Sequence, residues 1–458
     1  MSEILISGCE AVATMDDAGT EIPGGSMLIR DGGIAWVGSG RPDGAAGAEV
    51  VDGAGTVALP GFVNAHHHLF QALTRARAQR AGLFAWLREL YPVWAGLDEE
   101  WVRAGAAVGL AELALSGCST TTDHHYLFPA GAGDLLAAEI ETAAEIGLRF
   151  QPGRGSMDLG ESAGGLPPDA VVEDADAVLA ATEDAVRRHH DPGPGAMVRV
   201  AVSPCSPFSV SDRLMRESAD LARRLGVRLH THIAETADEE AYCRERFGRR
   251  PVELLEDQGF LGPDVWLAHC VHLDDADVAR LARTRTGVAW CPASNLRLGS
   301  GIARARDLLD AGAPVGFGVD GSASNDGGDL QAEARLAMLV ARAGGDPGAL
   351  DAREALRVAT RGGAACLGRD DLGAIEPGRR ADVALFDVGD LAHAGAAADP
   401  VAAVLLCAPR GARDLFVEGR AVVRGGRLVT ANQDAIAERG HRVARRILAR
   451  TPAAKAAP

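Results

Sequence analysis

Short apolar runs separated by turn sequences mark both ends of the chain. Near the amino end, the runs 26–30 and 34–37 flank the turn Asp31-Gly32-Gly33, an arrangement typical of a β-hairpin. The same pattern returns near the carboxyl end in the runs 381–386, 414–417 and 421–423. We therefore predict that half-sheets from the two ends pair into one small β-sandwich.

The stretch between them, 59–370, alternates short apolar runs with helical segments. This alternation is typical of a parallel sheet whose faces are covered by helices. In 212–225, for example, apolar residues recur at helical spacing and Gly226 follows as a stop. Eight β/α units in about 310 residues have the size of a (β/α)8 barrel. The strand candidates end near Ala65, Thr122, Pro152, Ser203, Thr231, Ala268, Trp290 and Val319.

The predicted fold class is therefore α/β, a (β/α)8 TIM barrel with a composite β-sandwich formed by the two ends of the chain. A single core in 458 residues is plausible only as a large barrel of this kind. We assign 1–58 to the amino-terminal half of the sandwich, 59–370 to the barrel and 371–432 to the carboxyl-terminal half. The remaining stretch, 433–458, is predicted to be a helix followed by a tail.

The charge of the chain limits its partners. It contains 46 Lys or Arg residues and 63 Asp or Glu residues, a formal charge of -17, whereas binding to a phosphate backbone needs a basic excess. We therefore expect a small-molecule substrate and no nucleic acid. No run approaches the roughly 18 apolar residues of a membrane span, so we expect no membrane contact.

The eight cysteines lie far apart, without a Cys-x-x-Cys pair, and most stand in apolar runs. This usage is typical of reduced thiols that pack as small hydrophobes. The first residues also lack the basic and apolar regions of an export signal. We expect a cytoplasmic protein that forms a homo-oligomer.

Polar residues gather where the predicted strands end, which is the active face of a barrel of this kind. The first strand candidate is followed by His66-His67-His68. Because side chains alternate along a strand, His66 and His68 face one side and can close on a single cation.

Three further strand ends carry matching chemistry: His232 with Glu235 in the loop that follows, His269, and Asp320. A single histidine in an apolar strand is more often a hydrogen-bonded core residue, but the set as a whole favours a site. Three imidazoles and a carboxylate suit zinc or ferrous iron, with one position left for water. Glu235 is placed for general acid/base work. We interpret His230, one layer deeper, as structural.

Five motifs resemble the amidohydrolase superfamily in its chlorohydrolase and aminohydrolase branch. They are Pro60-Gly61-Phe62-Val63-Asn64-Ala65-His66-His67-His68, His232-Ile233-Ala234-Glu235-Thr236, Ala268-His269-Cys270-Val271-His272, Cys291-Pro292-Ala293-Ser294-Asn295 and Gly318-Val319-Asp320-Gly321-Ser322-Ala323-Ser324-Asn325. With the sandwich segments, the resemblance covers nearly the whole chain. Within that branch, the stretches 68–76, 83–87, 90–94, 123–129 and 154–157 resemble the 8-oxoguanine deaminases.

The resemblance implies roles for six residues. The implied metal ligands are His66, His68, His232 and Asp320, and the implied catalytic residues are Glu235, His269 and Asp320.

The lysine content bears on the number of metal ions. Two-metal members of the superfamily use a carboxylated lysine as a bridge, whereas lysine occurs here once, at Lys455 in the tail. We therefore expect one divalent metal ion, zinc in the first place and iron as the alternative. Cys205, the other candidate bridge, is interpreted as a wall of the pocket.

The implied reaction is the hydrolytic deamination of a flat heterocycle, 8-oxoguanine to urate and ammonia. Asp320 would take a proton from water, Glu235 would protonate the neighbouring ring nitrogen, and His269 would stabilise the oxygen of the tetrahedral intermediate. The candidate substrate-binding residues, which offer donors, acceptors or a wall to the ring, are Gln71, Tyr126, Arg154 and Cys205.

Other substrates remain open. Isocytosine, guanine, a pterin or an s-triazine, by dechlorination or dealkylamination, would use the same ligands. Guanine is disfavoured because Pro204-Cys205-Ser206 stands where guanine deaminases carry a Pro-Arg-Phe stretch. A relative that binds a metabolite without turning it over is the alternative from another class, but binding alone needs neither Glu235 nor Asp320.

Overall fold

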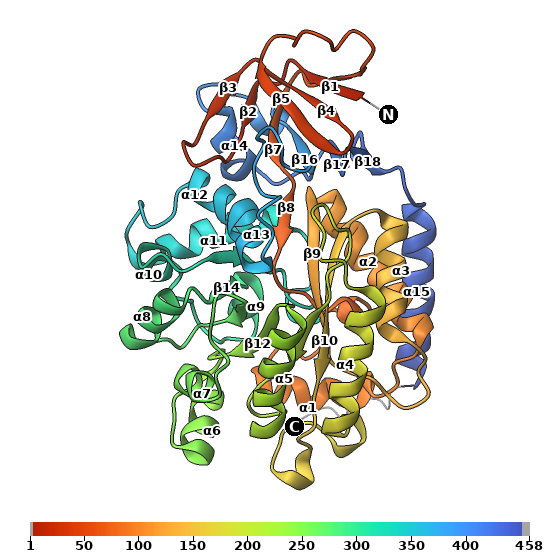
Figure 1. Ribbon diagram of the computed structural model, residues 1–458, viewed down its shortest axis with the longest axis vertical. Helices are drawn as coiled ribbons and strands as arrows, with labels where there is room; N and C mark the ends of the chain where they lie inside the picture. The colour runs from red at the N-terminus through yellow and green to blue at the C-terminus, as the bar shows by residue number, and fades with distance from the viewer. Residues whose placement is uncertain (1–2, 451–458) are drawn as a thin grey trace.

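The structure, a computed structural model, describes residues 3–450 (Figure 1). At its centre, eight parallel strands pair in chain order. They are β8 (Phe62–Asn64), β9 (Cys118–His125), β10 (Arg149–Ser156), β11 (Ala201–Pro204), β12 (Leu229–Ile233), β13 (Val265–His269), β14 (Gly287–Trp290) and β15 (Val315–Phe317). The Ala65 amide donates to the Phe317 carbonyl at 2.8 Å, which joins the first strand to the last. The predicted (β/α)8 barrel is confirmed.

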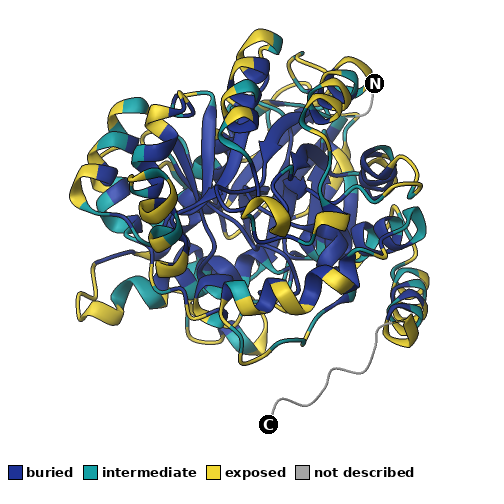
Figure 2. Cartoon of the chain, turned by 90° about the horizontal axis from the view of Figure 1, so that it is seen from below, coloured by how far each residue is buried: buried dark blue, intermediate teal, exposed yellow. Residues whose placement is uncertain are grey.

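Helices cover the outside of the barrel. Figure 2 shows buried strands at the centre, surrounded by helices whose exposed faces point outward. As predicted, α5 (Asp212–Leu225) stops at its cap residue Gly226, where φ is +68°, a value that glycine adopts without steric cost. The other helices of this layer are α1 (Leu83–Trp94), α2 (Glu99–Leu115), α3 (Leu135–Ile146), α4 (Ala175–His189), α6 (Ala237–Phe247), α7 (Pro251–Asp257), α8 (Asp275–Thr284), α9 (Pro292–Arg297), α10 (Ala305–Asp310), α11 (Leu330–Ala341), α12 (Ala352–Arg357) and α13 (Gly363–Leu367).

Two barrel strands run further than the sequence pattern predicted. β9 ends at His125 rather than near Thr122, and β10 ends at Ser156 rather than near Pro152. Every residue of both strands is buried, so polar side chains at their carboxyl ends bond to other buried groups instead of marking a loop. The polar residues His124 and His125 therefore lie within a strand.

Both ends of the chain build the sandwich, as predicted. Its seven-stranded sheet has the order β19-β18-β17-β16-β7-β2-β3, in which β7 from the amino end pairs with β16 from the carboxyl end. The four-stranded sheet, β5-β4-β1-β6, packs against it through a cluster that includes Ile6, Met27 and Val383. The strands are β1 (Glu3–Ser7), β2 (Ala11–Ala13), β3 (Glu21–Pro23), β4 (Gly25–Arg30), β5 (Gly33–Ser39), β6 (Glu49–Asp52), β7 (Thr56–Pro60), β16 (Val383–Asp387), β17 (Asp414–Val417), β18 (Arg420–Arg424) and β19 (Arg427–Leu428).

The carboxyl end returns to the barrel. After α14 (Pro400–Leu406) and the last strands, α15 (Gln433–Arg450) lies beside α2 (Figure 1). Arg446 Nη2 donates to both carboxylate oxygens of Asp98, at 2.9 and 3.0 Å, and fixes the helix there. None of the helices described between residues 3 and 450 is long and apolar enough to cross a membrane. Lys455 lies outside the described residues.

Candidate metal and active site

The four side chains predicted to bind the metal lie together at the carboxyl ends of the barrel strands. His66 and His68 follow β8, His232 is in β12 and Asp320 follows β15. His66 Nε2 and His68 Nε2 lie 3.3 and 3.4 Å from Asp320 Oδ1, and His68 Nε2 lies 3.0 Å from His232 Nε2. All four side chains are buried.

A hydrogen bond at the other ring nitrogen fixes the tautomer of His66. His230 Nδ1 bonds to the Trp266 carbonyl at 2.8 Å, so this nitrogen donates and His230 Nε2 is bare in a neutral ring. That bare nitrogen accepts from His66 Nδ1 at 2.9 Å. His66 Nε2 therefore presents a lone pair to the site. His230 supports His66 from behind, in line with its interpretation as structural.

The tautomers of His68 and His232 are fixed in the same way. Their Nδ1 atoms donate to the carbonyls of His124 and Cys205, each at 2.7 Å, and burial lowers the pKa of His68 to about 3, so that ring is neutral. Two bare Nε2 atoms 3.0 Å apart repel each other unless a cation lies between them. Three imidazole lone pairs and one carboxylate oxygen fit a divalent transition-metal ion.

Asp320 is held by its own loop. The Gly321 amide donates to Asp320 Oδ1 at 2.7 Å and the Ser324 hydroxyl donates to Oδ2 at 3.0 Å. These bonds fix the orientation of the carboxylate and leave one lone pair on each oxygen for the site.

The backbone is strained at three of the strand ends that carry the site. The φ angles of Ala234, His269 and Asp320 are 52°, 73° and 58°. Residues with a Cβ rarely adopt this left-handed region, and such conformations concentrate at functional sites.

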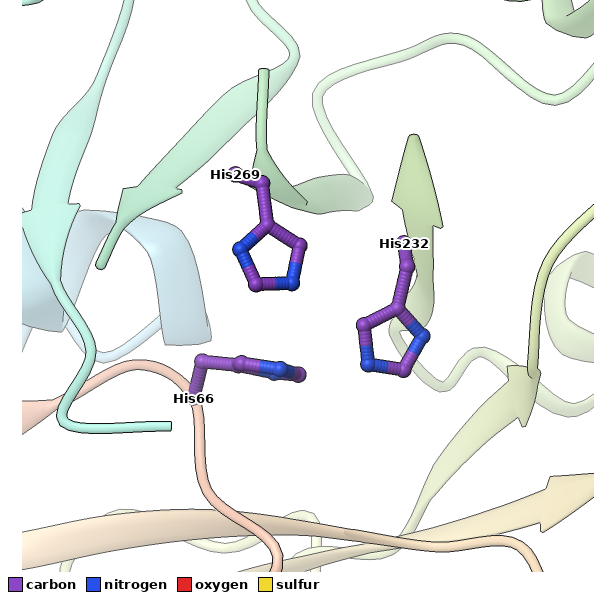
Figure 3. A group of neighbouring side chains, drawn as sticks. All are labelled: His66, His232 and His269. Carbon is purple, nitrogen blue, oxygen red and sulfur yellow. The ribbon is translucent and has the colours of Figure 1, made fainter. Parts of the chain in front are cut away.

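His269 faces the same centre. Figure 3 shows the rings of His66, His232 and His269 pointing toward one another from three elements, and their nitrogens lie within 4.8 Å. Asn295 Nδ2 donates to His269 Nδ1 at 3.1 Å, so the neutral ring keeps its hydrogen on Nε2. Burial lowers the pKa of His269 to about 3, which favours the neutral ring. His269 thus offers a donor to the centre, whereas the three predicted ligands offer lone pairs.

Glu235 is held through its backbone. The two carboxylate oxygens of Glu239 accept from the amides of Ala234 and Glu235, at 3.0 and 2.7 Å. Glu235 Oε2 lies 3.5 Å from His269 Nε2. Burial, together with the charges of Asp320 and Glu239, holds the pKa of Glu235 well above its usual range. A carboxyl that keeps its proton near neutral pH can serve as a general acid.

A cavity opens beside these groups. One side is apolar and is formed by Leu83, Trp86 and Leu87 of α1 with Phe208 and Leu298. The same helix also buries Leu90 and Trp94 in the core, so α1 both packs the barrel and walls the cavity. An apolar wall suits the face of an aromatic ring.

Gln71, Tyr126 and Cys205 line the same cavity, where the sequence placed them. Gln71 Nε2 donates to the Tyr126 hydroxyl at 3.4 Å, and Gln71 Oε1 is buried without a partner. We call Gln71 and Tyr126 the polar edge of the cavity. Burial raises the pKa of the Cys205 thiol to about 12, so the thiol stays protonated and forms a wall.

Arg154 is placed elsewhere. It lines a different cavity, beside Phe128 and His189. Its Nη1 and Nη2 atoms donate to Glu173 at 2.9 and 2.7 Å, and its guanidinium lies 3.8 Å from the centre of the Phe128 ring. Arg154 is not among the residues that line the cavity beside the metal-binding side chains, and its contact with a substrate stays a prediction.

Three side chains that position the site had no role in the sequence analysis. Asn295 and Ser324 lie within motifs that resemble the amidohydrolase superfamily, but those motifs alone gave neither residue a function. Glu239 lies four residues after Glu235, in the first turn of α6. An acidic residue at this position is common in helices, so its presence gave no functional signal. Only the bonds to Ala234 and Glu235 reveal its second role.

This geometry suits water activated on a cation and directed at an electron-poor carbon, the chemistry of a metal-dependent hydrolase. Residues 57–422 match the model of the amidohydrolase family. The chain belongs to this family, as its motifs predicted, and is an enzyme.

Individual relatives narrow the comparison. The chain is 46% identical over 398 residues to an 8-oxoguanine deaminase of Pseudomonas aeruginosa, covering 86% of this chain and 88% of that protein. It is 40% identical to a hydroxydechloroatrazine ethylaminohydrolase of Pseudomonas sp. (strain ADP), over 98% of this chain and 96% of the other. The crystal structure of atrazine chlorohydrolase TrzN from Arthrobacter aurescens TC1, complexed with zinc, superposes with a TM-score of 0.93 at 36% identity, covering 96% and 100% of the two chains.

Proposed function

We propose that this enzyme is a hydrolytic deaminase that converts 8-oxoguanine to urate and ammonia. The observation that carries the proposal is the 46% identity to an 8-oxoguanine deaminase over 86% of the chain. The site supports it because a cation site, a proton acceptor and a carboxyl with a raised pKa lie beside a cavity with an apolar wall and a polar edge.

We infer that the site holds one zinc ion, bound by His66, His68, His232 and Asp320. The zinc-complexed TrzN structure supports the choice of metal. When bound, the ion lowers the pKa of a water molecule toward neutrality and so makes it a nucleophile. A single ion is favoured because the only lysine of the chain is Lys455, outside the barrel.

Residues of the chain then transfer the protons of the reaction. Asp320 accepts a proton from the attacking water and later passes it to the departing amine. Glu235 donates a proton to the ring nitrogen beside the attacked carbon, which is C2 in 8-oxoguanine. It regains a proton from the new hydroxyl group when the carbonyl forms and ammonia leaves. The Nε2 hydrogen of His269 bonds to the oxygen that forms on this carbon and stabilises its charge.

The polar edge and the apolar wall share the recognition of the ring. The free Gln71 Oε1 accepts from a ring N–H, and the Tyr126 hydroxyl can donate to a ring carbonyl. Leu83, Trp86 and Leu87 contact the face of the ring. A buried acceptor without a partner favours a substrate that supplies the missing donor.

A substrate panel tests the proposal. Purified zinc-loaded enzyme is assayed for ammonia release from 8-oxoguanine, guanine, isocytosine, a pterin and an aminotriazine, with Glu235→Gln as the background control. We expect kcat/KM for 8-oxoguanine to exceed the others by about tenfold or more, because a wrong ring leaves polar groups unpaired. Preference for another ring would overturn the substrate assignment, and folded, zinc-loaded enzyme that releases no ammonia from any of them would favour the non-catalytic alternative.

A second candidate is an s-triazine substrate. The specific observation in its favour is the 40% identity over 98% of the chain to the hydroxydechloroatrazine ethylaminohydrolase. Release of an alkylamine from a hydroxytriazine, at a kcat/KM above that for 8-oxoguanine, would select this reaction.

Two further expectations stay predictions. All eight cysteines are free in the described residues, which is compatible with the reducing cytoplasm proposed from the sequence. Light scattering of the purified protein would test the proposed homo-oligomer.

A further inference from the structure

A second cluster of titratable side chains lies behind the cavity. Asp123 and His125 are in β9, Glu139 is in α3, and all three are fully buried. Within residues 3–450, no arginine forms an ion pair with any of them. Two buried carboxyl groups without a cation are costly as ions, so the protons in this cluster have to be located.

Hydrogen bonds locate the protons. His125 Nε2 bonds to the Leu127 carbonyl at 2.8 Å and must donate, because a carbonyl only accepts. His125 Nδ1 lies 2.8 Å from Glu139 Oε1. In a neutral ring Nδ1 accepts, so Glu139 carries the hydrogen of this bond. Burial lowers the pKa of His125 to about 4 and raises the pKa of Glu139 well above its usual range, which agrees with a neutral pair.

The chain of bonds continues to Asp123. Its Oδ1 accepts from the Leu69 amide at 2.5 Å. Asp123 Oδ2 and Glu139 Oε2 are both buried without a partner, and ligand atoms of the two carboxyls lie within 4.8 Å of each other. A hydrogen shared by these two oxygens would satisfy both, and Asp123 supplies it, because Glu139 donates its own hydrogen to His125. Burial and the nearby Glu139 raise the pKa of Asp123 well above its usual range, as this bond requires.

Both ends of the chain of bonds reach the backbone of the polar edge. Leu69 opens the 3-10 helix Leu69–Leu73, which carries Gln71, and Leu127 directly follows Tyr126. Phe70 packs edge-on against both sides, with ring centres 5.4 Å from His125 and 5.5 Å from Tyr126.

We propose that the uncharged relay Leu69 N–H, Asp123, Glu139, His125 and Leu127 carbonyl positions Gln71 and Tyr126, and thereby sets how the cavity recognises its ring. The three side chains are positioning residues, because none of them lines the cavity. The inference rests on the proposed function for its substrate readout, but not for the protonation of the relay.

The same three side chains could instead hold a second metal ion, since their ligand atoms lie within 4.8 Å of one another. The relay needs no ion, because every hydrogen in it has an acceptor. Amide variants separate the two readings. In Asp123→Asn and Glu139→Gln, each new NH2 group donates where the carboxyl donated and each remaining oxygen accepts as before, whereas a metal site would lose an anionic ligand.

The first experiment compares steady-state kinetics and metal content of Glu139→Gln, Glu139→Leu and the matched control Thr142→Val, which removes a buried hydroxyl one turn along α3. We expect Glu139→Gln and Thr142→Val to behave like wild type. Glu139→Leu should raise KM about tenfold, because one unpaired buried group costs enough free energy for that shift. The change in kcat should be smaller, and the metal content should stay at one zinc ion per chain. An unchanged KM and substrate preference in folded Glu139→Leu would overturn the proposal, as would a second ion that is lost in Glu139→Gln.

The second experiment needs no substrate. In 15N-histidine-labelled holoenzyme, NMR reports the tautomer of each ring, and the His125 signals are assigned by their shift in Glu139→Gln. We expect a neutral ring with its hydrogen on Nε2 from pH 6 to 9. A doubly protonated His125 in that range would overturn the uncharged relay. If the substrate panel fails but this tautomer is found, the proposed function is wrong and the relay stands.

Discussion

The hydrogen on each imidazole ring decides what that ring can do in this site. His68 and His232 donate through Nδ1 to carbonyls and keep a lone pair on Nε2. His66 does the same through a fourth ring, His230. His269 instead accepts from Asn295 and keeps its Nε2 hydrogen. Residue type made all of them candidate ligands, but their partners divide them into lone-pair donors and a hydrogen-bond donor.

Glu235→Gln tests the assigned proton donor. The variant keeps the size and burial of the side chain but cannot transfer a proton, so kcat should fall about 10²- to 10⁴-fold. Zinc content should not change, because Glu235 is not among the predicted ligands. Ammonia release and metal analysis measure the two quantities.

The exposed neighbour Asp238 provides the control for that variant. Asp238→Asn removes a carboxylate close in sequence and should leave kcat unchanged. Wild-type turnover in Glu235→Gln would show that another group protonates the ring.

Single helices and strands differ in how far their local sequence defines them. The stop at Gly226 and the hairpin turn at Asp31 and Gly32 appear where the pattern predicted them, because positive φ angles there depend on residue type alone. β9 and β10 continue past their apolar runs because tertiary partners satisfy their polar ends. A run of polar residues therefore predicts a loop only where those residues hydrogen-bond to water.

Glu239→Gln tests the contact between α6 and the end of β12. Two backbone amides donate to the Glu239 carboxylate, and an amide side chain offers one acceptor in place of two. We expect a loss of about 1–3 kcal/mol in the free energy of unfolding, since one buried N–H is left without a partner. We also expect kcat to fall more than KM rises, because the Glu235 backbone is released while the polar edge is untouched.

Urea unfolding and steady-state kinetics measure both effects. Glu245→Gln, an exposed position of the same helix, is the matched control and should match wild type. Full activity in a destabilised Glu239→Gln would reduce Glu239 to a structural residue.

For the molecule as a whole, one buried arginine connects the barrel to the sandwich. Arg149, the first residue of β10, donates to both oxygens of Asp382, at 2.7 and 3.0 Å, and also to Glu418. Arg149 is fully buried and Asp382 lies just before β16. The pairing closes the amino end of the barrel against the sandwich.

Arg149→Ala should therefore lower the free energy of unfolding by about 3–5 kcal/mol, because it leaves the Asp382 carboxylate buried without its cation. Arg213→Ala, which breaks an exposed pair with Asp176, should cost much less, because water screens that pair. Urea titration of the two variants compares them directly, and similar losses in both would contradict the assigned role of Arg149.

Removal of the metal should loosen the barrel, because the predicted ligands follow the first strand, lie in the fifth and follow the eighth. Chelation should abolish ammonia release and lower the free energy of unfolding by about 3–4 kcal/mol, relative to enzyme in a 100- to 1,000-fold excess of zinc over its dissociation constant. Calorimetry with and without chelator measures the shift. Full activity in metal-free enzyme would refute the proposed mechanism.

Local patterns along the chain were enough to predict the barrel, the composite sandwich and the set of polar strand ends. Periodicity, turn residues and the motifs around His66, Glu235 and Asp320 act over a few residues, so they can be read directly from the order of amino acids. The placement of Gln71 and Cys205 beside the cavity also followed from that order.

The protonation of each ring, the partners of Arg154 and the relay behind the polar edge came from the folded chain alone. The bonds that decide them join residues far apart, such as His66 and His230, separated by 164 positions. Burial removes the competing water, so each of these groups takes the character that its neighbours impose. No local pattern contains those neighbours, because they meet only when the barrel closes.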